Sequence, residues 1–306
     1  MRRFSCSFAI AVLILSLPAA AFGWNSTGHR VVALIAYKTL DGPTRIQVCN
    51  ILKDHPAAAS LWVGRDVNSS DDAQASMFLN AATFPDDARP RTSEFFPFSK
   101  PTDHYVNFQL DKAGNLGAPA GNGSLLTSFQ QNLMATRTAA KPADRAIALS
   151  WIFHQVGDAH QPLHAVARFS DKFPMGDEGG NLVKPFPDPR GKFQELHGYW
   201  DDLLGSDTDV DQFNELDSIA DDIMNLHPAN TFGLDMKKLD ITLWTRDEGG
   251  PLARDVVYRP LLITVDDGDG FSKLPNGYEI KAQAVGRERV ALAGYRLAEQ
   301  LKKLFP

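Results

Sequence analysis

The densest group of potentially reactive side chains lies in the segment HQVGDAHQPLH, residues 154–164. His154 and Asp158 are four residues apart, so on a helix they share one face. Pro162 cannot continue the hydrogen bonding of such a helix, and we expect the chain to bend there and to carry His164 toward the same cavity. Histidine nitrogens and a carboxylate oxygen that converge in this way suit a divalent metal ion, zinc above all.

A second pair with the same spacing follows in the segment HGYWD, where His197 and Asp201 are also four residues apart. One such pair is more often a surface hydrogen bond than a metal site. Two pairs, with His164 beyond a proline, favour metal binding, because three of the eight histidines of the chain lie within one short segment.

Helices must position these side chains, since strand signals are sparse. Apolar residues recur with the period of an amphipathic helix in residues 26–40, 124–138, 142–157, 211–226, 235–246 and 279–304. The best strand signal is the run YVNF at 105–108. Long loops rich in Pro and Gly are expected at 84–102, 111–123, 169–196 and 262–278. We therefore predict an all-α fold with long loops that carry function.

The last of these loops contains the acidic run DDGDG, residues 266–270. Such a run could indicate calcium, but it lacks the full spacing of a helix-loop-helix calcium site. We interpret it as a solvated turn and keep calcium as the less favoured alternative.

The first 23 residues are typical of a secretory signal peptide. Arg2 and Arg3 precede an apolar run over residues 8–18, and Ala21 and Gly23 supply small side chains before a cleavage site. The apolar run is too short to span a membrane, and no other segment is apolar enough to do so. We expect a mature domain of residues 24–306, which is secreted or periplasmic.

The cysteines and the net charge limit the classes of protein that fit. Cys6 leaves with the signal peptide, so Cys49 has no partner for a disulfide, and stability must come from a core or from metal ions. Loss of Arg2 and Arg3 changes the net charge from −6 to −8. This argues against a protein that binds nucleic acid through a basic surface, but bound cations could still attract a phosphate substrate.

These motifs together resemble the zinc-dependent, single-strand-specific nucleases of the S1/P1 type. The resemblance rests on six segments in the expected order: WNSTGH (24–29), ATFPDDAR (82–89), DHYVNF (103–108), FHQVGDAHQPLH (153–164), GGN (179–181) and LHGYWD (196–201). The C-terminal third has no matching motif and is expected to supply packing helices. The lack of disulfides suggests a bacterial-type member.

The resemblance implies a single mainly helical domain of the phospholipase C and nuclease type, with three zinc ions in one cleft. The ligands that it implies form three sets, of which the first two share Asp158: Trp24, His29 and Asp158; Asp86, His104, His154 and Asp158; and His164, His197 and Asp201 with water. Trp24 would bind through its carbonyl and its α-amine, which exists only after signal cleavage and has a lower pKa than a lysine amine. Asp87 is the rival of Asp86, which the motif register favours.

The implied activity is hydrolysis of single-stranded DNA and RNA to 5′-phosphorylated products, with release of phosphate from 3′-nucleotides. Two zinc ions joined by Asp158 would activate a water for attack on phosphorus, which places Asp86 and Asp158 at the catalytic centre. The resemblance places the substrate beside Tyr105, Asn107, Asn181 and Arg89. A base must stack in a pocket, which a duplex resists. For Arg89, a contact to phosphate and a salt bridge to Asp86 or Asp87 are equally favoured.

Two other functions compete with this interpretation. The zinc-dependent phospholipases C share the N-terminal tryptophan, but usually have a longer gap before the first histidine and a glutamate at the position of Asp201. A non-catalytic zinc-binding protein is disfavoured, because the ligand sets leave coordination positions open. His160 is expected to be a hydrogen-bonding residue rather than a ligand, and no role is assigned to His55 or His227. We expect neither a membrane span nor an obligate protein partner.

Overall fold

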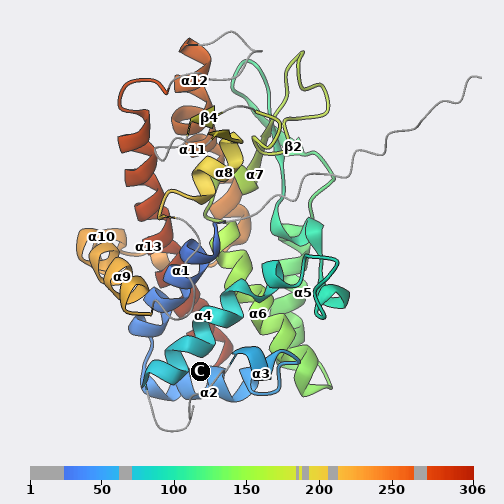
Figure 1. Cartoon of the computed structure of the whole chain (residues 1–306), viewed down its shortest axis with the longest axis vertical. Coiled ribbons are helices and arrows are strands. Elements are labelled where there is room, and N and C mark those ends of the chain that lie inside the picture. The colour runs from blue at the N-terminus through green and yellow to red at the C-terminus, as the bar shows by residue number, and fades with distance from the viewer. Residues whose placement is uncertain (1–23, 62–70, 184–185, 188–192, 206–212, 265–273) are drawn as a thin grey trace, which may run out of the picture.

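The computed structural model describes residues 24–61, 71–183, 186–187, 193–205, 213–264 and 274–306, and these form a mainly helical molecule (Figure 1). Four long helices make its centre: α1 (Ser26–Thr39), α4 (Asp71–Asp87), α6 (Pro142–Asp158) and α13 (Tyr278–Leu304). Helix α1 packs against the other three, and α4 packs against α6. The predicted all-α class is therefore confirmed, apart from a small sheet.

Shorter helical segments surround this centre. They are α2 (Gly42–Leu52), α3 (Ala58–Leu61), α5 (Leu125–Thr138), α7 (Pro162–Ala165), α8 (Leu196–Asp201), α9 (Phe213–Leu226), α10 (Ala229–Phe232), α11 (Gly250–Leu252) and α12 (Arg259–Thr264). Single 3₁₀ turns are η1 (Phe96–Phe98), η2 (Pro101–His104) and η4 (Asp235–Lys237), and two π-helical segments are η5 (Leu243–Gly249) and η6 (Ala253–Tyr258). None of the described helices combines the length and apolar composition that crossing a bilayer requires.

A three-stranded sheet lies beside the helices, in the order β2 (Leu116–Pro119), β1 (Phe108–Leu110), β3 (Val166–Arg168). Strand β1 is antiparallel to β2 and parallel to β3. The parallel pairing extends back by one hydrogen bond, from the Val106 amide to the His164 carbonyl at 3.0 Å. It therefore holds the segment after His104 against the segment that carries His164. A second pair, β4 (Phe186–Pro187) and β5 (Phe193–Gln194), is antiparallel.

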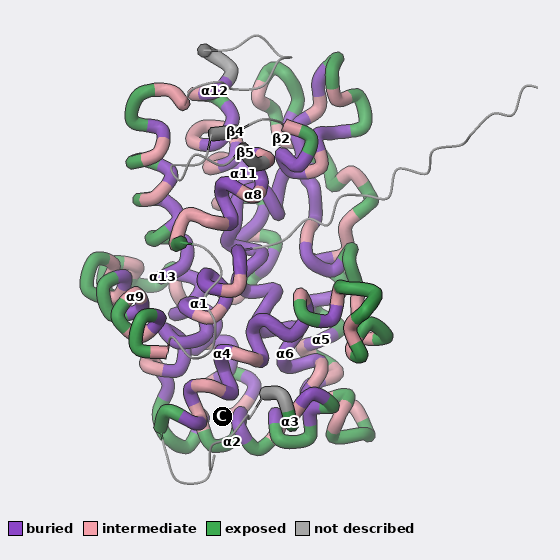
Figure 2. The backbone as a smooth tube through the Cα atoms, viewed as in Figure 1, coloured by how far each residue is buried: buried purple, intermediate pink, exposed green. Residues whose placement is uncertain are grey.

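The core lies where the four long helices meet, and buried backbone runs continuously through it (Figure 2). Phe78 on α4 is completely buried, and its ring packs edge-on against Tyr37 of α1 and Phe153 of α6, each at a centroid distance of 5.1 Å. One side chain therefore joins three of the helices that carry the candidate site.

Replacing Phe78 with alanine is expected to lower the free energy of unfolding by about 3–5 kcal/mol, because a cavity would remain between three helices. Urea denaturation of the metal-free protein measures this loss. Phe78→Leu fills most of the same volume and should cost much less. A loss below about 1 kcal/mol for Phe78→Ala would contradict the central role of this contact.

The helical period predicted α1, α6 and α13 but not α4, and several other expectations were wrong. Residues 84–102 are not all loop, since α4 continues through Pro85 to Asp87. A proline this close to a helix end disrupts little of the helix that precedes it. The strand begins at Phe108 rather than at residue 105, because Asn107 has a φ of +55°, which a strand does not allow. Residues 235–246 form a 3₁₀ turn and the start of a π-helical segment. The segments 1–23 and 266–270 lie outside the described residues.

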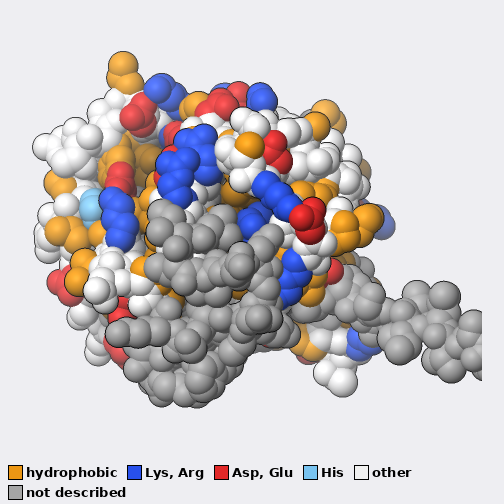
Figure 3. All heavy atoms as spheres, turned by 90° about the horizontal axis from the view of Figure 1, so that it is seen from above, with side chains coloured by type: hydrophobic (Ala, Val, Ile, Leu, Met, Phe, Trp, Pro, Cys, Tyr) orange, Lys and Arg blue, Asp and Glu red, His pale blue; other side chains and the backbone are white. Residues whose placement is uncertain are grey.

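One face of the surface carries side chains of both charge signs. Viewed from above, several Lys and Arg side chains stand among hydrophobic and acidic ones on the described part of the surface (Figure 3).

Candidate metal centre

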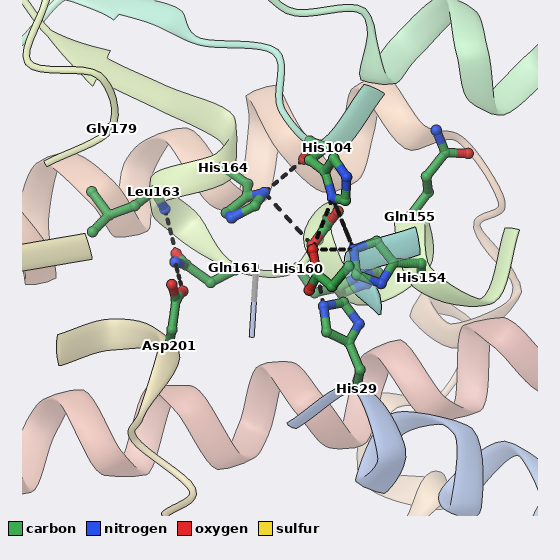
Figure 4. A network of polar contacts seen from close by, with 12 residues as sticks. His29, His104, His154, Gln155, His160, Gln161, Leu163, His164, Gly179 and Asp201 are labelled. Atoms are coloured by element: carbon green, nitrogen blue, oxygen red, sulfur yellow. Dashed lines mark hydrogen bonds and ion pairs between the residues drawn. The ribbon is translucent and has the colours of Figure 1, made fainter. Parts of the chain in front are cut away.

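Eight of the nine predicted ligands form three groups whose donor atoms lie within 4.8 Å of one another inside each group. The groups are His29, His154 and Asp158; Asp86, His104 and His154; and His164, His197 and Asp201. They come from α1, the end of α4, η2, α6, α7 and α8. The side chains of His29, His104 and His154 approach each other from different elements, while Asp201 and His164 lie to one side (Figure 4).

Asp158 is the last residue of α6 and joins two of these groups. Its Oδ1 lies 3.4 Å from Nε2 of His29, and its Oδ2 lies 3.2 Å from both His104 Nδ1 and His154 Nε2. The side chain is completely buried. One carboxylate therefore offers one oxygen to each of two neighbouring donor groups.

His154 is held so that one ring nitrogen faces the second group. Its Nδ1 donates to the carbonyl of Ala82 on α4 at 2.8 Å, which directs Nε2 toward His104 Nδ1 at 2.9 Å. Both of these nitrogens lie 3.8 Å from Oδ1 of Asp86. A backbone carbonyl that fixes the far nitrogen is the usual outer partner of a metal-binding histidine.

The third group has the same construction. Nε2 of His197 lies 3.1 Å from Nε2 of His164 and 3.5 Å from Oδ2 of Asp201. The far nitrogens donate to backbone carbonyls, from His164 to His104 at 2.6 Å and from His197 to Gly179 at 2.7 Å. Gln161 donates to the other oxygen of Asp201 at 2.7 Å. Each member of the group is therefore oriented by a second contact.

The bend at Pro162 agrees with its predicted role. Helix α6 ends at Asp158, and Pro162 occupies the first turn of the short helix α7. His164 Nδ1 consequently lies 3.6 Å from Oδ1 of Asp158. The third group is thus adjacent to the first two.

Buried donor atoms without hydrogen bonds show that these residues fit a set of cations. His29 Nε2 and Asp158 Oδ1, which face each other in the first group, are buried and have no hydrogen-bond partner within the described part of the chain. Buried polar atoms are rarely left in this state without compensation. Mixed imidazole and carboxylate donors are the set that zinc prefers.

The pKa values of the metal-free site show which groups hold protons. Burial lowers the pKa of His29 and brings that of His104 to about 4, so both rings are neutral near pH 7. Burial opposes protonation of His154 too, but the charges of Asp158 and Asp86 outweigh it and raise the pKa to about 9. Burial also raises the pKa of Asp201 well above its ordinary value. Without a cation, the centre therefore holds protons that a metal must displace.

Zinc binding at pH 7–8 is accordingly expected to release protons, chiefly from His154, and the apparent affinity should rise with pH up to about 9. The affinity should fall as the pH is lowered, since ligand nitrogens must be unprotonated. Calorimetric titration in two buffers of different ionisation enthalpy at one pH measures the release. Equal heats in both buffers would contradict the prediction.

Trp24 lies buried at the start of α1, one turn before His29. The Asn25 amide donates to the Asp201 carbonyl at 3.3 Å, and the Asn25 side chain caps α1 by accepting from the Gly28 amide at 3.1 Å. A Cβ at Gly28 would lie 2.6 Å from Cβ of Trp24, so only glycine allows this packing. The N-terminal segment is therefore fixed between α1 and the end of α8.

Gly157 makes a similar close approach possible at the first group. A Cβ there would lie 2.7 Å from Nδ1 of His29, whose ring stacks on that of His154 at a centroid distance of 3.8 Å. Packing of the His29 ring therefore requires a glycine at position 157, which the spacing of His154 and Asp158 did not indicate.

The predicted substrate residues lie in different settings. Arg89 donates to Asp86 Oδ1 at 3.1 Å, so the salt bridge is present, and Asp87 instead accepts from Thr83 at 3.1 Å. Asn107 is buried and donates to Asn122 at 3.2 Å, and Asn181 donates to the Glu178 carbonyl at 2.8 Å. The structure groups Asp86 rather than Asp87 with the histidines.

Tyr105 is half-buried between two charges of opposite sign. Burial raises the pKa of its hydroxyl, the carboxylate of Glu178 raises it further, and the guanidinium of Arg89 opposes both. Glu178 was not among the predicted residues. Glu178 has a φ of +54°. It and Asn107 are the two non-glycine residues with a left-handed backbone in the described parts of the chain. A sequence gives no signal for such a conformation at a glutamate.

The remaining histidines lie outside the three groups. His160 is completely buried and hydrogen-bonded to Val156 and Arg296, which confirms that it is a structural hydrogen-bonding residue. His55 packs edge-on against Phe84 and accepts from the Ala57 amide, and burial lowers its pKa to about 4.

Comparison with known proteins gives a consistent result over nearly the whole chain. The family model described as S1/P1 Nuclease matches residues 24–306. Nuclease S1 of Aspergillus oryzae is 25% identical, with 95% of each chain covered. Endonuclease 2 of Arabidopsis thaliana is 24% identical, with 97% of this chain and 95% of that protein covered.

Proposed function

This chain belongs to the S1/P1 nuclease family, and from that premise we propose that it is a three-zinc endonuclease specific for single-stranded DNA and RNA, with 3′-nucleotidase activity. The family is one of zinc-dependent nucleases, so the chain is a hydrolase of phosphodiester bonds in nucleic acids. The single observation that carries the finer proposal is Asp158, whose two oxygens face two different donor groups.

In the proposed centre, Trp24, His29 and Asp158 hold the first zinc, and Asp86, His104, His154 and Asp158 hold the second. His164, His197 and Asp201 hold the third. Zinc bound there supplies Lewis acidity, which lowers the pKa of water toward 7 and neutralises charge on the phosphate. Asp158 fixes the spacing of the first two sites, because both of its oxygens belong to one rigid carboxylate at the end of α6. The outer carbonyls of Ala82 and Gly179 keep the histidine rings from rotating.

The substrate is proposed to lie over Tyr105, with its phosphate toward the cation groups. Arg89 is 7% exposed and is held by Asp86, so its guanidinium is a fixed positive charge at the edge of the centre. The Tyr105 ring offers a stacking surface that an unpaired base can reach and a base inside a duplex cannot. In this proposal Asn107 and Asn181 supply amide groups beside the stacked base. Because a base must be unpaired to stack on Tyr105, the enzyme should prefer single strands.

Tyr105→Ala is expected to weaken binding of single-stranded substrate by about 1–3 kcal/mol, or roughly 5- to 150-fold in KM, because a stacked base loses its partner. Steady-state kinetics on a short oligonucleotide measure it. Tyr105→Phe keeps the ring and should remain near the parent protein. An unchanged KM for Tyr105→Ala would remove this residue from the base site.

The proposal as a whole is tested with the processed, zinc-loaded protein and four substrates: single-stranded DNA, RNA, a matched DNA duplex and a 3′-nucleotide. Cleavage of the single strands to 5′-phosphorylated products, slow attack on the duplex and release of inorganic phosphate from the nucleotide are expected. Phosphatidylcholine vesicles serve as the control substrate. Lipid cleavage alone would favour the phospholipase alternative, and no cleavage of any substrate would favour a zinc-binding protein without activity.

We also propose that residues 1–23 are removed on export and that the active domain begins at Trp24. The family model begins at the same residue, which supports the proposal. N-terminal sequencing of protein recovered outside the cytoplasm should give the sequence WNSTGH, and a different first residue would contradict it.

A further inference from the structure

The turn between α6 and α7 carries proposed ligands at both ends, and α13 holds its middle through hydrogen bonds to His160. Asp158 precedes the turn and His164 follows it, while His160 lies between them and is completely buried. His160 Nδ1 lies 2.7 Å from the Val156 carbonyl, and its Nε2 lies 2.9 Å from Nη1 of Arg296. A carbonyl only accepts and a guanidinium only donates, so His160 is the neutral tautomer with its proton on Nδ1.

Two arginines of α13 reach this turn. Arg289 and Arg296 are seven residues apart, which is two helical turns, so they share one face of α13. Arg289 Nε donates to the backbone carbonyl of His160 at 3.3 Å, while Arg296 donates to its side chain. Both arginines are buried, at 5% and 0% exposure. The turn is thus held through its backbone and through its side chain at one residue.

Glu248 joins the two arginines. It accepts from Arg289 at 2.7 Å, and from Arg296 at 2.7 and 2.6 Å. Glu248 belongs to the π-helical segment η5, whose Trp244 ring lies 5.1 Å from the His160 ring and 5.4 Å from the Arg296 guanidinium. Short π-helical segments are rare and occur frequently at functional sites.

Stability alone does not account for this group of charges. A buried ion pair recovers little more than the cost of its desolvation, and apolar residues of similar size are often as stable. What such a network supplies is fixed geometry, since each partner accepts only a narrow range of positions. Outer partners of metal ligands act in this way, and their loss typically weakens metal binding.

We propose that Glu248 is a positioning residue for the metal centre, which sets zinc affinity by fixing the turn between Asp158 and His164 through Arg289, Arg296 and His160. The inference rests on the proposed zinc function, and it assigns a role at the centre to the C-terminal third of the chain.

The test compares zinc retention in the full processed chain with that of Glu248→Gln, which keeps the shape and removes the charge. Release of zinc to a chromophoric chelator is expected to show an affinity about 10- to 100-fold weaker, with activity largely restored by excess zinc. Arg296→Lys keeps the positive charge but cannot contact His160, Glu248 and the Asp235 carbonyl at the same time, and it should shift affinity in the same direction. If Glu248→Gln does not fold, the zinc affinity of Arg296→Lys tests the inference.

Two controls on α13 separate positioning from general stability. Tyr295→Phe removes the hydrogen bond from Tyr295 to the His227 carbonyl, next to Arg296 in sequence, and should leave zinc affinity unchanged. Leu301→Ala opens a cavity at a completely buried position of the same helix and should lower the melting temperature while zinc affinity stays that of the parent.

Parent-like zinc release in both Glu248→Gln and Arg296→Lys would overturn the inference alone. The inference would also be overturned if Leu301→Ala lost as much zinc affinity as Glu248→Gln. If the parent protein itself retains no zinc, the proposed function fails and this inference fails with it.

Discussion

Asp158→Asn is expected to lower nuclease activity by at least about 10³-fold and to reduce the zinc content of the purified protein. The carboxylate faces His29 with one oxygen and both His104 and His154 with the other, so the substitution weakens two proposed sites at once. An amide is nearly the same size but carries no negative charge and offers only one oxygen. Turnover on single-stranded DNA and elemental analysis for zinc measure the two effects.

Asp87→Asn is the matched control, because it makes the same chemical change at an exposed carboxylate outside the three donor groups. It should keep both zinc and activity. Near-parental turnover in Asp158→Asn would refute the shared-ligand assignment. Loss of zinc in Asp87→Asn but not in Asp86→Asn would instead make Asp87 the ligand of the second site.

A preparation that retains one methionine before Trp24 is expected to contain one zinc fewer than the processed protein and to lose about 10²-fold or more of its activity. An amine nitrogen has a lone pair for a metal ion, whereas the amide nitrogen that replaces it does not. Trp24 is completely buried and packs on Gly28, so the extended chain cannot relocate this residue without disturbing the start of α1.

Removal of the extra residue by an aminopeptidase provides the control for this experiment. Zinc content and activity should return together, which shows that the extended protein was folded. Full zinc content in the extended chain would show that the amine of Trp24 is not a ligand.

Local patterns explain which parts of the centre could be predicted. The pairs His154 with Asp158 and His197 with Asp201 each lie on one helix, where a spacing of four fixes a common face. The bend before His164 followed from Pro162. The apolar period predicted helices at 26–40, 124–138, 142–157, 211–226 and 279–304, and the structure has them at 26–39, 125–138, 142–158, 213–226 and 278–304. Helix α4 was not predicted: residues 71–83 carried no expectation of a helix, and residues 84–87 were expected to be loop, since a proline is normally read as a helix end.

The grouping of His29, Asp86 and His104 with α6 came from family resemblance rather than from spacing. These residues lie on different elements, and only the packing of α1 and α4 on α6, with the pairing of β1 and β3, brings them together. Glu178 gave no signal in the sequence at all, because its left-handed backbone depends on the loop around it.

The sequence by itself determined the donor chemistry, the helical class and the ligand pairs within single helices, because residue type and a spacing of a few residues govern these directly. The tertiary structure alone decided that Gly157 admits the ring of His29 and that Arg296 reaches His160 across 136 residues of chain. Such contacts form only when apolar helix faces bury one another, and that burial depends on the whole chain rather than on any local pattern.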